Sequence, residues 1–432
     1  MMLEKLFHLS ENGTTVRTEI IAGITTFMTM AYIIFVNPSV LAQAGMDFGA
    51  VMVATVVASS LACFLMGLWV NYPIALAPGM GLNAYFTYSV VLGMGYSWEA
   101  ALGAVFISGT LFLFLTLLKV RQLIIEAIPE TIKISTAAGI GLFIAFIGLQ
   151  NAGIVVDHPQ TLVTLGRFAT PEVLLTLLGV GVISGLMALN IRGAILFGIL
   201  LNWILGMVLG LVEFQGLFSL PPNPAPTFLK LDLSGILSEG LLTIIFAFFF
   251  VDLFDSTGTM VGVAEQAGFI KKDGTFPRVE RALTTDAVGT ISGALLGTST
   301  VTAYIESASG VAEGGRTGLT TVTVAILFLL SLFISPLARS IPLFATAPAL
   351  IVVGSLMLKQ ITRIDWDNLT DAIPAFAVML FMPLTYSIAN GIAIGFIMFP
   401  LIKGISGRFR EVHWLTWILG VLFLLRFLFL AL

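Results

Sequence analysis

Long hydrophobic runs separated by short polar connections dominate the chain from Ile20 onward. A helix that crosses a bilayer needs about 20 mostly apolar residues. Runs of this kind predict fourteen membrane segments and one further apolar helix at 414–432. The fourteen segments fall at 20–43, 50–70, 79–91, 97–118, 132–154, 172–190, 193–213, 237–263, 284–297, 305–315, 317–338, 343–358, 372–386 and 388–403. The segments at 79–91, 284–297 and 305–315 are too short to cross as helices alone.

Basic residues are unevenly distributed over the loops between these segments. Because positive charge favours the cytoplasmic side, we place residues 1–19, with Lys5 and Arg17, in the cytoplasm. The even-numbered loops then lie inside, and they hold Lys119, Arg121, Arg192, Lys271, Lys272, Arg278, Arg281, Arg316, Lys359, Arg363, Lys403, Arg408 and Arg410. The long outer loop 214–235 has only Lys230, and Arg339 departs from the rule. The pattern predicts a multi-pass protein of the plasma (bacterial inner) membrane.

Composition agrees with an all-α polytopic membrane protein. The 432 residues are 58% hydrophobic and 10% charged, against about 25% charged in soluble domains. Cys63 is the only cysteine, which excludes an intrachain disulfide and a cysteine-based metal cluster. The three histidines lie outside the apolar runs, at positions 8, 158 and 413. We therefore expect no metal and no cofactor, and the net charge of −4 gives no indication of nucleic-acid binding.

The chain contains a weak internal repeat. VLAQAGM at 40–46 resembles VAEQAGF at 263–269, an offset of 223 residues. The same offset relates further polar positions, Asn83 to Glu306, Tyr32 to Asp255 and Thr29 to Asp252. Seven segments in each half is an odd number, so the halves should be inverted in the membrane. Inverted repeats are typical of secondary transporters.

The third and tenth segments contain helix breakers or strand formers. Pro73 and Pro78 prevent a continuous helix through NYPIALAPGMGLNAYF, so 74–77 should be extended before a half-helix that starts near Gly81. GTSTVTAYIESASG at 297–310 predicts a short extended piece and then a half-helix near Ile305. The two extended pieces can pair with each other. Broken segments in corresponding positions of two halves indicate a binding site near the middle of the membrane.

Four acidic residues lie in or near the apolar segments, namely Asp252, Asp255, Asp286 and Glu306. A charge inside the bilayer costs about 3 kcal/mol, so such residues are candidates for function. Asp286 has the alternative of capping or bridging helices. These segments contain no compensating Lys or Arg, which favours a neutral or cationic substrate over an anion. A carboxylate removed from water takes up a proton more readily, as a proton-coupled transporter requires.

Carboxylates and the Asn83 amide suit a flat solute with N–H donors and ring acceptors. Three other interpretations are weaker. GMGLNA fits a dinucleotide-binding pattern, but no soluble βαβ unit surrounds it. The D-x-x-D spacing could hold Mg²⁺ against a diphosphate, but no second acidic motif accompanies it. In a channel, acids typically form rings rather than one midplane site.

Four motifs resemble the nucleobase–ascorbate (uracil/xanthine/purine) transporter family, and most closely its azaguanine-type branch, which carries hypoxanthine, guanine and adenine. The motifs are TTFMTMAYIIFVNP (25–38), PGMGLNAYF (78–86), VDLFDSTGT (251–259) and TSTVTAYIESASGVAEGGRTG (298–318). The resemblance implies a proton symporter that imports purine nucleobases by an elevator-like movement, with the proton gradient as the driving force. A carrier of another nucleobase, uracil or xanthine, is the alternative.

The resemblance also implies domains and roles. A 7+7 inverted fold would have a core domain at 20–118 and 237–338, and a gate domain at 132–213 and 343–432 that includes the C-terminal helix. The gate often forms the dimer interface in this family, so a homodimer surrounded by lipid is the expected assembly. The implied substrate-binding residues are Asn83, Asp252, Asp255 and Glu306. The implied proton-coupling candidates are Asp255, Asp286 and Glu306.

Overall fold

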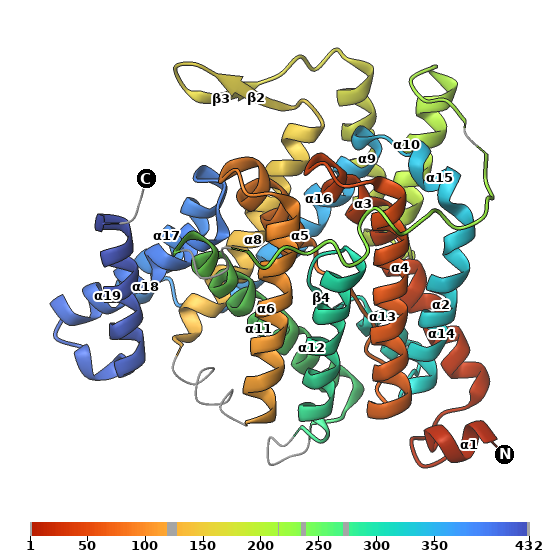
Figure 1. The fold of residues 1–432 in the computed structure, drawn as a ribbon, viewed down its shortest axis with the longest axis horizontal. Coiled ribbons are helices and arrows are strands. Elements are labelled where there is room, and N and C mark those ends of the chain that lie inside the picture. The colour runs from red at the N-terminus through yellow and green to blue at the C-terminus, as the bar shows by residue number, and fades with distance from the viewer. Residues whose placement is uncertain (1, 119–127, 215, 235–238, 271–275, 430–432) are drawn as a thin grey trace. The chain divides into compact units, whose positions relative to one another are not determined.

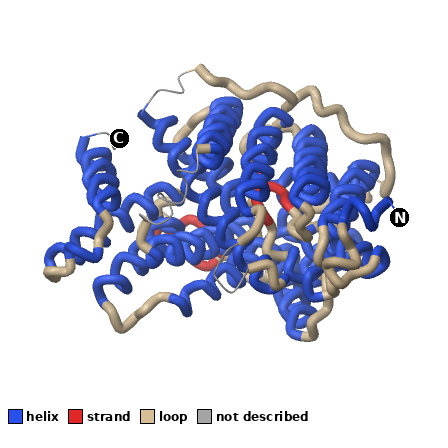
Figure 2. The backbone as a smooth tube through the Cα atoms, turned by 90° about the horizontal axis from the view of Figure 1, so that it is seen from below, coloured by secondary structure: helices blue, strands red, loops and turns tan. Residues whose placement is uncertain are grey.

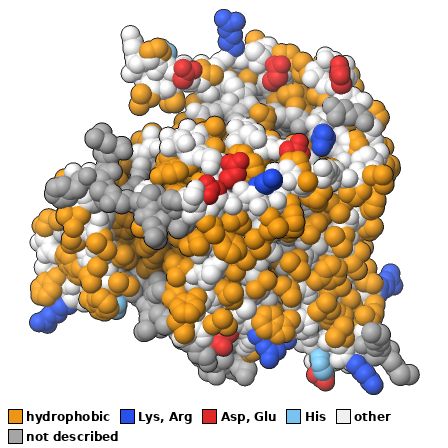
Figure 3. Space-filling model, in the orientation of Figure 1, with side chains coloured by type: hydrophobic (Ala, Val, Ile, Leu, Met, Phe, Trp, Pro, Cys, Tyr) orange, Lys and Arg blue, Asp and Glu red, His pale blue; other side chains and the backbone are white. Residues whose placement is uncertain are grey.

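The computed structural model describes residues 2–118, 128–214, 216–234, 239–270 and 276–429. Helices dominate these ranges, with two pairs of short strands among them (Figures 1 and 2). Nine helices in the described ranges are long and apolar enough to cross a membrane, and three shorter helices are also apolar. The face drawn in Figure 3 is mainly hydrophobic, with charged side chains gathered above and below. This is the architecture of a multi-pass membrane protein.

The chain folds as two compact units. Unit 1 comprises residues 1–117 and 148–349, and unit 2 comprises residues 118–147 and 350–432. Helices α8 (Glu130–Asn151) and α16 (Leu343–Met357) have residues in both units. The expected core and gate domains are defined by their movement relative to each other, whereas these two units are defined by packing. The units therefore do not test that expectation.

Unit 1 holds both strand pairs and most of the helices. Its elements before α8 are α1 (Met2–Phe7), α2 (Val16–Met30), α3 (Ile33–Gln43), α4 (Phe48–Leu65), η1 (Met66–Val70), β1 (Leu76–Pro78), α5 (Met80–Ala84), η2 (Tyr85–Gly93) and α6 (Trp98–Leu117). Its later elements are β2 (Val155–His158), β3 (Leu162–Leu165), α9 (Pro171–Ala188), α10 (Ala194–Val208), α11 (Glu239–Ala267), α12 (Val279–Leu296), β4 (Val301–Ala303), α13 (Ser307–Ala312), α14 (Gly318–Ser331), η3 (Leu332–Ile334) and α15 (Ser335–Ser340).

Unit 2 is built around three consecutive helices that pack in chain order. Its further elements are η4 (Leu358–Arg363), α17 (Leu369–Leu384), α18 (Ile388–Ile405), η5 (Phe409–Glu411) and α19 (Trp414–Phe429). Lys403 is only 3% exposed, and its Nζ lies 3.2 Å from Asp371 Oδ2 and 3.0 Å from Glu411 Oε2. Hydrogen bonds from Arg408 and Lys403 hold the pKa of Glu411 below its ordinary value. The C-terminal apolar run is a separate helix.

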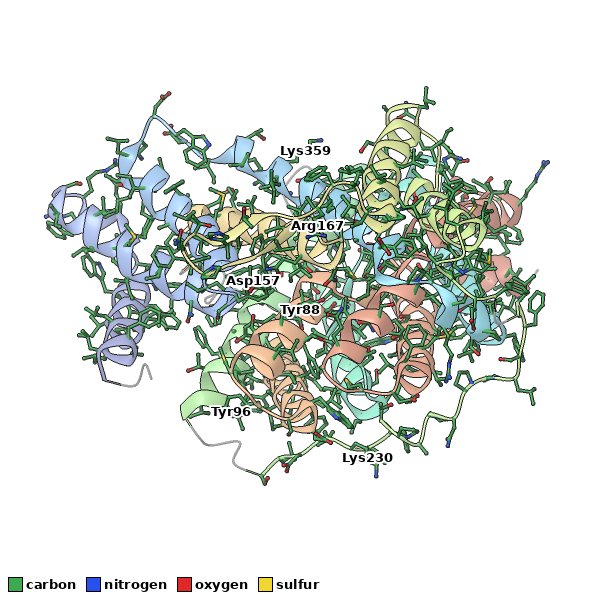
Figure 4. The ribbon with its side chains drawn as sticks, turned by 90° about the horizontal axis from the view of Figure 1, so that it is seen from above. Tyr88, Tyr96, Asp157, Arg167, Lys230 and Lys359 are labelled. Carbon is green, nitrogen blue, oxygen red and sulfur yellow. The ribbon has the colours of Figure 1, made fainter. Side chains whose placement is uncertain are left out.

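One predicted segment differs from the structure, and one hairpin was not predicted. The helix at the predicted segment 284–297 is longer than predicted, because α12 begins at Val279 and has 18 residues, but it is not among the nine candidate spans of the described ranges. Its first turn contains Glu280 and Arg281, whose charges hid the start of the helix from a reading of hydropathy alone. The strands β2 and β3 form an antiparallel hairpin that the sequence analysis missed, and Asp157 and Arg167 mark it in Figure 4. Its signal was the β-branched composition of VVDH and LVTL.

The segment between α10 and α11 is the long loop that the sequence predicts. Its described part runs without helices or strands along unit 1, where Lys230 is labelled in Figure 4. Leu229 N donates to Leu295 O at the end of α12 (2.8 Å), and Asp232 N donates to Glu99 O in α6 (2.9 Å). Of the basic residues used to orient the chain, those at 119, 121, 271 and 272 lie outside the described residues.

A buried carboxylate joins α2 to α14. Glu19 is fully buried and accepts hydrogen bonds from Arg316 N at 2.8 Å and from Thr317 N and Thr320 N at 3.2 Å each. The Thr320 hydroxyl donates to the same carboxylate at 2.6 Å. Glu19 thereby caps the free N–H groups at the start of α14, where a negative charge is favoured. Its position at the edge of the first apolar run kept it out of the predicted acidic set.

We expect Glu19→Gln to destabilise the protein, because its amide group places N–H donors against backbone N–H donors. A hydrogen bond to a buried charge contributes about 2 kcal/mol, so the loss should lower the Tm of the purified protein by several degrees. The matched control is Glu11→Gln, since Glu11 is exposed. Equal Tm values for the two variants, measured by thermal unfolding in detergent, would contradict the capping role.

Candidate functional site

The two broken segments meet as a two-stranded sheet inside unit 1. β1 pairs with β4 in antiparallel register, with Leu76 opposite Ala303 and Pro78 opposite Val301. Gly79 N donates to Thr300 O and Tyr304 N donates to Ala75 O, each at 2.9 Å, which extends the pairing beyond the strands. All six strand residues are buried. The predicted pairing of the two extended pieces is confirmed.

Each strand leads directly into a half-helix. α5 begins at Met80, one residue before the predicted start near Gly81, and α13 begins at Ser307, two residues after the predicted start near Ile305. Because the strands are antiparallel and three residues long, the two helix starts lie at opposite ends of a sheet only about 7 Å long. Side chains at these two starts therefore belong to one small region of the protein.

Glu306 and Asp255 come together in this region. Glu306 stands at the start of α13, and its Oε1 accepts a hydrogen bond from the Tyr32 hydroxyl at 3.0 Å. Asp255, from α11, lies near enough to act electrostatically on Glu306 and on the Tyr32 and Tyr304 hydroxyls. Both acidic residues are partly exposed rather than fully buried. Neither forms an ion pair with a basic side chain in the part of the chain that the structure describes.

Two tyrosines hold this acidic region to the rest of unit 1. Tyr32 lies at the short irregularity between α2 and α3, whereas its counterpart helix α11 is continuous. The Tyr304 hydroxyl donates to Pro78 O at 2.6 Å and so ties β4 to the end of β1. Both tyrosines are almost fully buried. The sequence analysis named Tyr32 only as the counterpart of Asp255 in the repeat, and it did not single out Tyr304.

Asp252 makes different contacts from Asp255. It is fully buried, and its carboxylate lies 3.4 Å from the Thr290 hydroxyl of α12 and 3.5 Å from the Ser256 hydroxyl. Ser256 also donates to Asp286 Oδ1 at 2.7 Å, so Asp286 bridges α11 and α12. Residues three apart on a helix diverge by about 60°, which lets α11 direct its two aspartates to different neighbours.

Asn83 supplies an amide in α5, the half-helix that follows β1. It is fully buried in α5, its Nδ2 lies 4.0 Å from Met80 Sδ, and its Oδ1 has no hydrogen-bond partner among the described residues. A buried carbonyl oxygen left without a partner costs about 1–3 kcal/mol, so a ligand or water that donates to it would be favoured. The same helix region continues into Tyr85 and Phe86, whose rings lie 5.1 and 6.5 Å from the ring of Phe248 on α11.

The structure therefore groups the predicted residues in three places. Asp255 and Glu306 lie together, Asp252 and Asp286 share the hydroxyl of Ser256 between α11 and α12, and Asn83 lies at the start of the other half-helix. The sequence analysis missed Ser256 and Thr290. Ser256 follows Asp252 by four residues, a spacing that puts both on one side of a helix and could have identified it.

The family model described as "Permease family" matches residues 17–394 of this chain. A protein from Methanocaldococcus jannaschii named as a permease is 59% identical over 430 residues, covering 99% of both chains. A guanine/hypoxanthine permease of Bacillus subtilis is 49% identical, covering 99% of this chain and all of its own. An adenine permease of Escherichia coli is 46% identical, covering 99% of this chain and 96% of its own.

Solved structures show the same fold at low sequence identity. The transmembrane domain of a cyanobacterium bicarbonate transporter aligns with a TM-score of 0.65 at 18% identity, covering 88% of this chain and 97% of that domain. The murine solute carrier 26 family member A9 anion transporter aligns with a TM-score of 0.63 at 12% identity, covering 90% of this chain and 68% of its own. These likenesses concern the fold alone.

The relatives are permeases and not enzymes, and the family model covers most of the chain. These matches show that the chain is a polytopic membrane permease and belongs to the nucleobase–ascorbate transporter family.

Proposed function

We propose that this protein is a proton-coupled symporter that imports purine nucleobases, namely hypoxanthine, guanine and adenine. The observation that carries the proposal is the meeting of Asp255 and Glu306 beside two half-helices, with no basic partner among the described residues. Relatives named as adenine and guanine/hypoxanthine permeases support the substrate class. A purine presents N–H donors for the carboxylates and a flat ring for the neighbouring aromatic side chains.

The substrate contacts follow from what each group can offer. Asp255 and Glu306 can accept hydrogen bonds from purine N–H groups, and Asn83 can both donate and accept. Because Oδ1 of Asn83 has no hydrogen-bond partner among the described residues, a purine N–H group that donates to it would be favoured. We also propose Asp252 as a substrate-binding residue. Because it is fully buried against α12, it would act on the substrate through its neighbours on α11.

Proton coupling requires a carboxyl group that changes its charge during the cycle. Glu306 and Asp255 are the first candidates, because two carboxylates close together favour holding a proton between them. Asp286 is the third, because Ser256 links it to the Asp252 region. The proton gradient would then supply the driving force, and no cofactor is needed.

We further propose that the fold is a 7+7 inverted repeat with core and gate domains. The sequence repeat at an offset of 223 residues supports this proposal, and so do the corresponding places of β1 and β4 in the two broken segments. In this arrangement the N-terminus is cytoplasmic, the core moves in an elevator-like manner, and a homodimer forms through the gate in the inner membrane. The alternative solute is uracil or xanthine on the same fold.

Uptake of radiolabelled hypoxanthine by proteoliposomes tests the substrate directly. Parallel samples would contain an uncoupler, or an excess of adenine, guanine, xanthine or uracil. We expect the uncoupler to abolish hypoxanthine uptake. Purines that the protein carries should compete with hypoxanthine, and uracil should not. Competition by uracil or xanthine alone would replace the purine proposal with the alternative solute.

We expect Asp255→Ala and Glu306→Ala to reduce hypoxanthine uptake at least about 100-fold, because each removes a carboxylate that can accept hydrogen bonds from the purine, and hydrogen bonds to a charged group contribute about 1.5–3 kcal/mol each. The matched controls are Asp157→Ala and Glu265→Ala, since both residues are exposed. Protein in the membrane would be quantified by immunoblotting. Normal uptake by either site variant would remove that residue from the site.

Glu306→Gln separates binding from proton coupling. The amide keeps the size and an acceptor oxygen but cannot change its charge, so hypoxanthine binding should persist while uptake against a gradient is lost. Equilibrium binding and exchange of internal for external hypoxanthine would be measured between pH 5 and 8. An unchanged pH dependence of net uptake in this variant would contradict a protonation role for Glu306.

Tyr32→Phe removes the hydroxyl that donates to Glu306 at 3.0 Å. A hydrogen bond to a charged group contributes about 1.5 kcal/mol, so we expect the KM for hypoxanthine to rise about tenfold. The control is Tyr96→Phe, because Tyr96 lies away from the acids, beside Gly240 at the start of α11. Equal KM values for the two variants would show that Tyr32 does not prepare Glu306 for the substrate.

A further inference from the structure

The sheet formed by β1 and β4 has two buried edges. Each strand pairs with the other along one side only, so its outward-facing N–H and C=O groups need partners elsewhere. Water cannot serve every such group inside a membrane protein, and an unsatisfied group there is costly. The side chains that close these edges therefore determine whether the strands, and the half-helices that follow them, keep their places.

Cys63 of α4 closes the edge of β1. Its Sγ lies 3.3 Å from Leu76 O and 3.2 Å from Leu76 N, so one thiol can donate to the carbonyl and accept from the amide. Cys63 is fully buried and is the only cysteine of the chain. A thiol has the long bonds and the mixed donor and acceptor character that bridging both groups of one residue requires.

Thr290 of α12 closes the edge of β4. Its hydroxyl lies 3.0 Å from Val301 O, and Thr290 is fully buried. The close approach depends on Gly293, where an added Cβ would lie 2.8 Å from Ser299 O. Val301 lies opposite Pro78 at one end of the sheet, and Leu76 lies opposite Ala303 at the other end. Each closing side chain therefore contacts the first residue of its strand.

Thr290 also connects β4 to Asp252 on α11. The same hydroxyl lies 3.4 Å from Asp252 Oδ2, and it has a single proton to share between the carboxylate and Val301 O. Two residues beyond the end of β4 the chain reaches Ile305, and then Glu306. The position of the Thr290 hydroxyl therefore bears on both Asp252 and the strand that carries Glu306.

We propose that Cys63 and Thr290 are positioning residues, which hold β1 and β4 so that Asn83 and Glu306 face the substrate. Thr290 in addition links Asp252 to β4. This inference rests on the proposed function in placing the substrate at the half-helices. Neither residue touches the substrate, and each acts through the strand whose edge it closes.

Thr290→Val tests the inference, because it keeps the shape and removes the hydroxyl. We expect the KM for hypoxanthine to rise about tenfold, equivalent to about 1.4 kcal/mol, with the amount of protein in the membrane unchanged. Thr290→Ser, which restores the hydroxyl, should return the KM to within about twofold of the original protein. The matched control is Thr285→Val, since Thr285 is equally buried on α12 and its hydroxyl has no partner among the described residues. Equal KM values for Thr290→Val and Thr285→Val would overturn the inference.

A second measurement does not depend on transport. Cys63 is the only thiol, so the rate of its reaction with N-ethylmaleimide in purified protein reports how firmly the sheet is closed. We expect this rate to rise about tenfold in Thr290→Val and to stay unchanged in Thr285→Val. If the original protein carries no purine, the proposed function fails while this comparison still tests the closure of the sheet. An unchanged rate in Thr290→Val would overturn the closure itself.

Discussion

The whole site depends on one constraint, that backbone groups released by breaking two membrane helices must find partners within the protein. Pro78 and its neighbours break one segment, and the Thr/Ser/Val run before Tyr304 breaks the other. The antiparallel pairing of β1 with β4 satisfies the released groups that face the partner strand. The pairing in turn fixes where the half-helices begin, and with them the places of Asn83 and Glu306.

Polar side chains in unit 1 then serve two separate purposes. One set faces the start of the half-helices, where Glu306 is held by Tyr32 and lies near Asp255. The other set forms a seam between α11 and α12, where Asp252 and Asp286 accept from hydroxyl groups. The seam is fully buried, whereas the first set is partly exposed. This difference fits a site that receives a solute on one side of α11 and is supported on the other.

Much of this could be predicted from local sequence. Pro73 and Pro78 prevent a continuous helix through the third segment. The offset that relates the two halves identified Asn83 and Glu306 as counterparts. Other features needed three-dimensional contacts. Glu19 became recognisable only when the N–H groups of α14 were placed against it, and the direction of Asp252 depended on the rotation of α11 relative to α12. A charged first turn concealed the start of α12, because hydropathy does not distinguish a helix end from a loop.

The most direct test of the central claim is whether hypoxanthine carries protons with it. Proteoliposomes that contain the purified protein and an internal pH indicator would receive external hypoxanthine without an imposed pH gradient. The proposed symport predicts internal acidification that follows hypoxanthine entry and is absent in Glu306→Gln. Entry of hypoxanthine with no change in internal pH would contradict proton coupling at the acidic site.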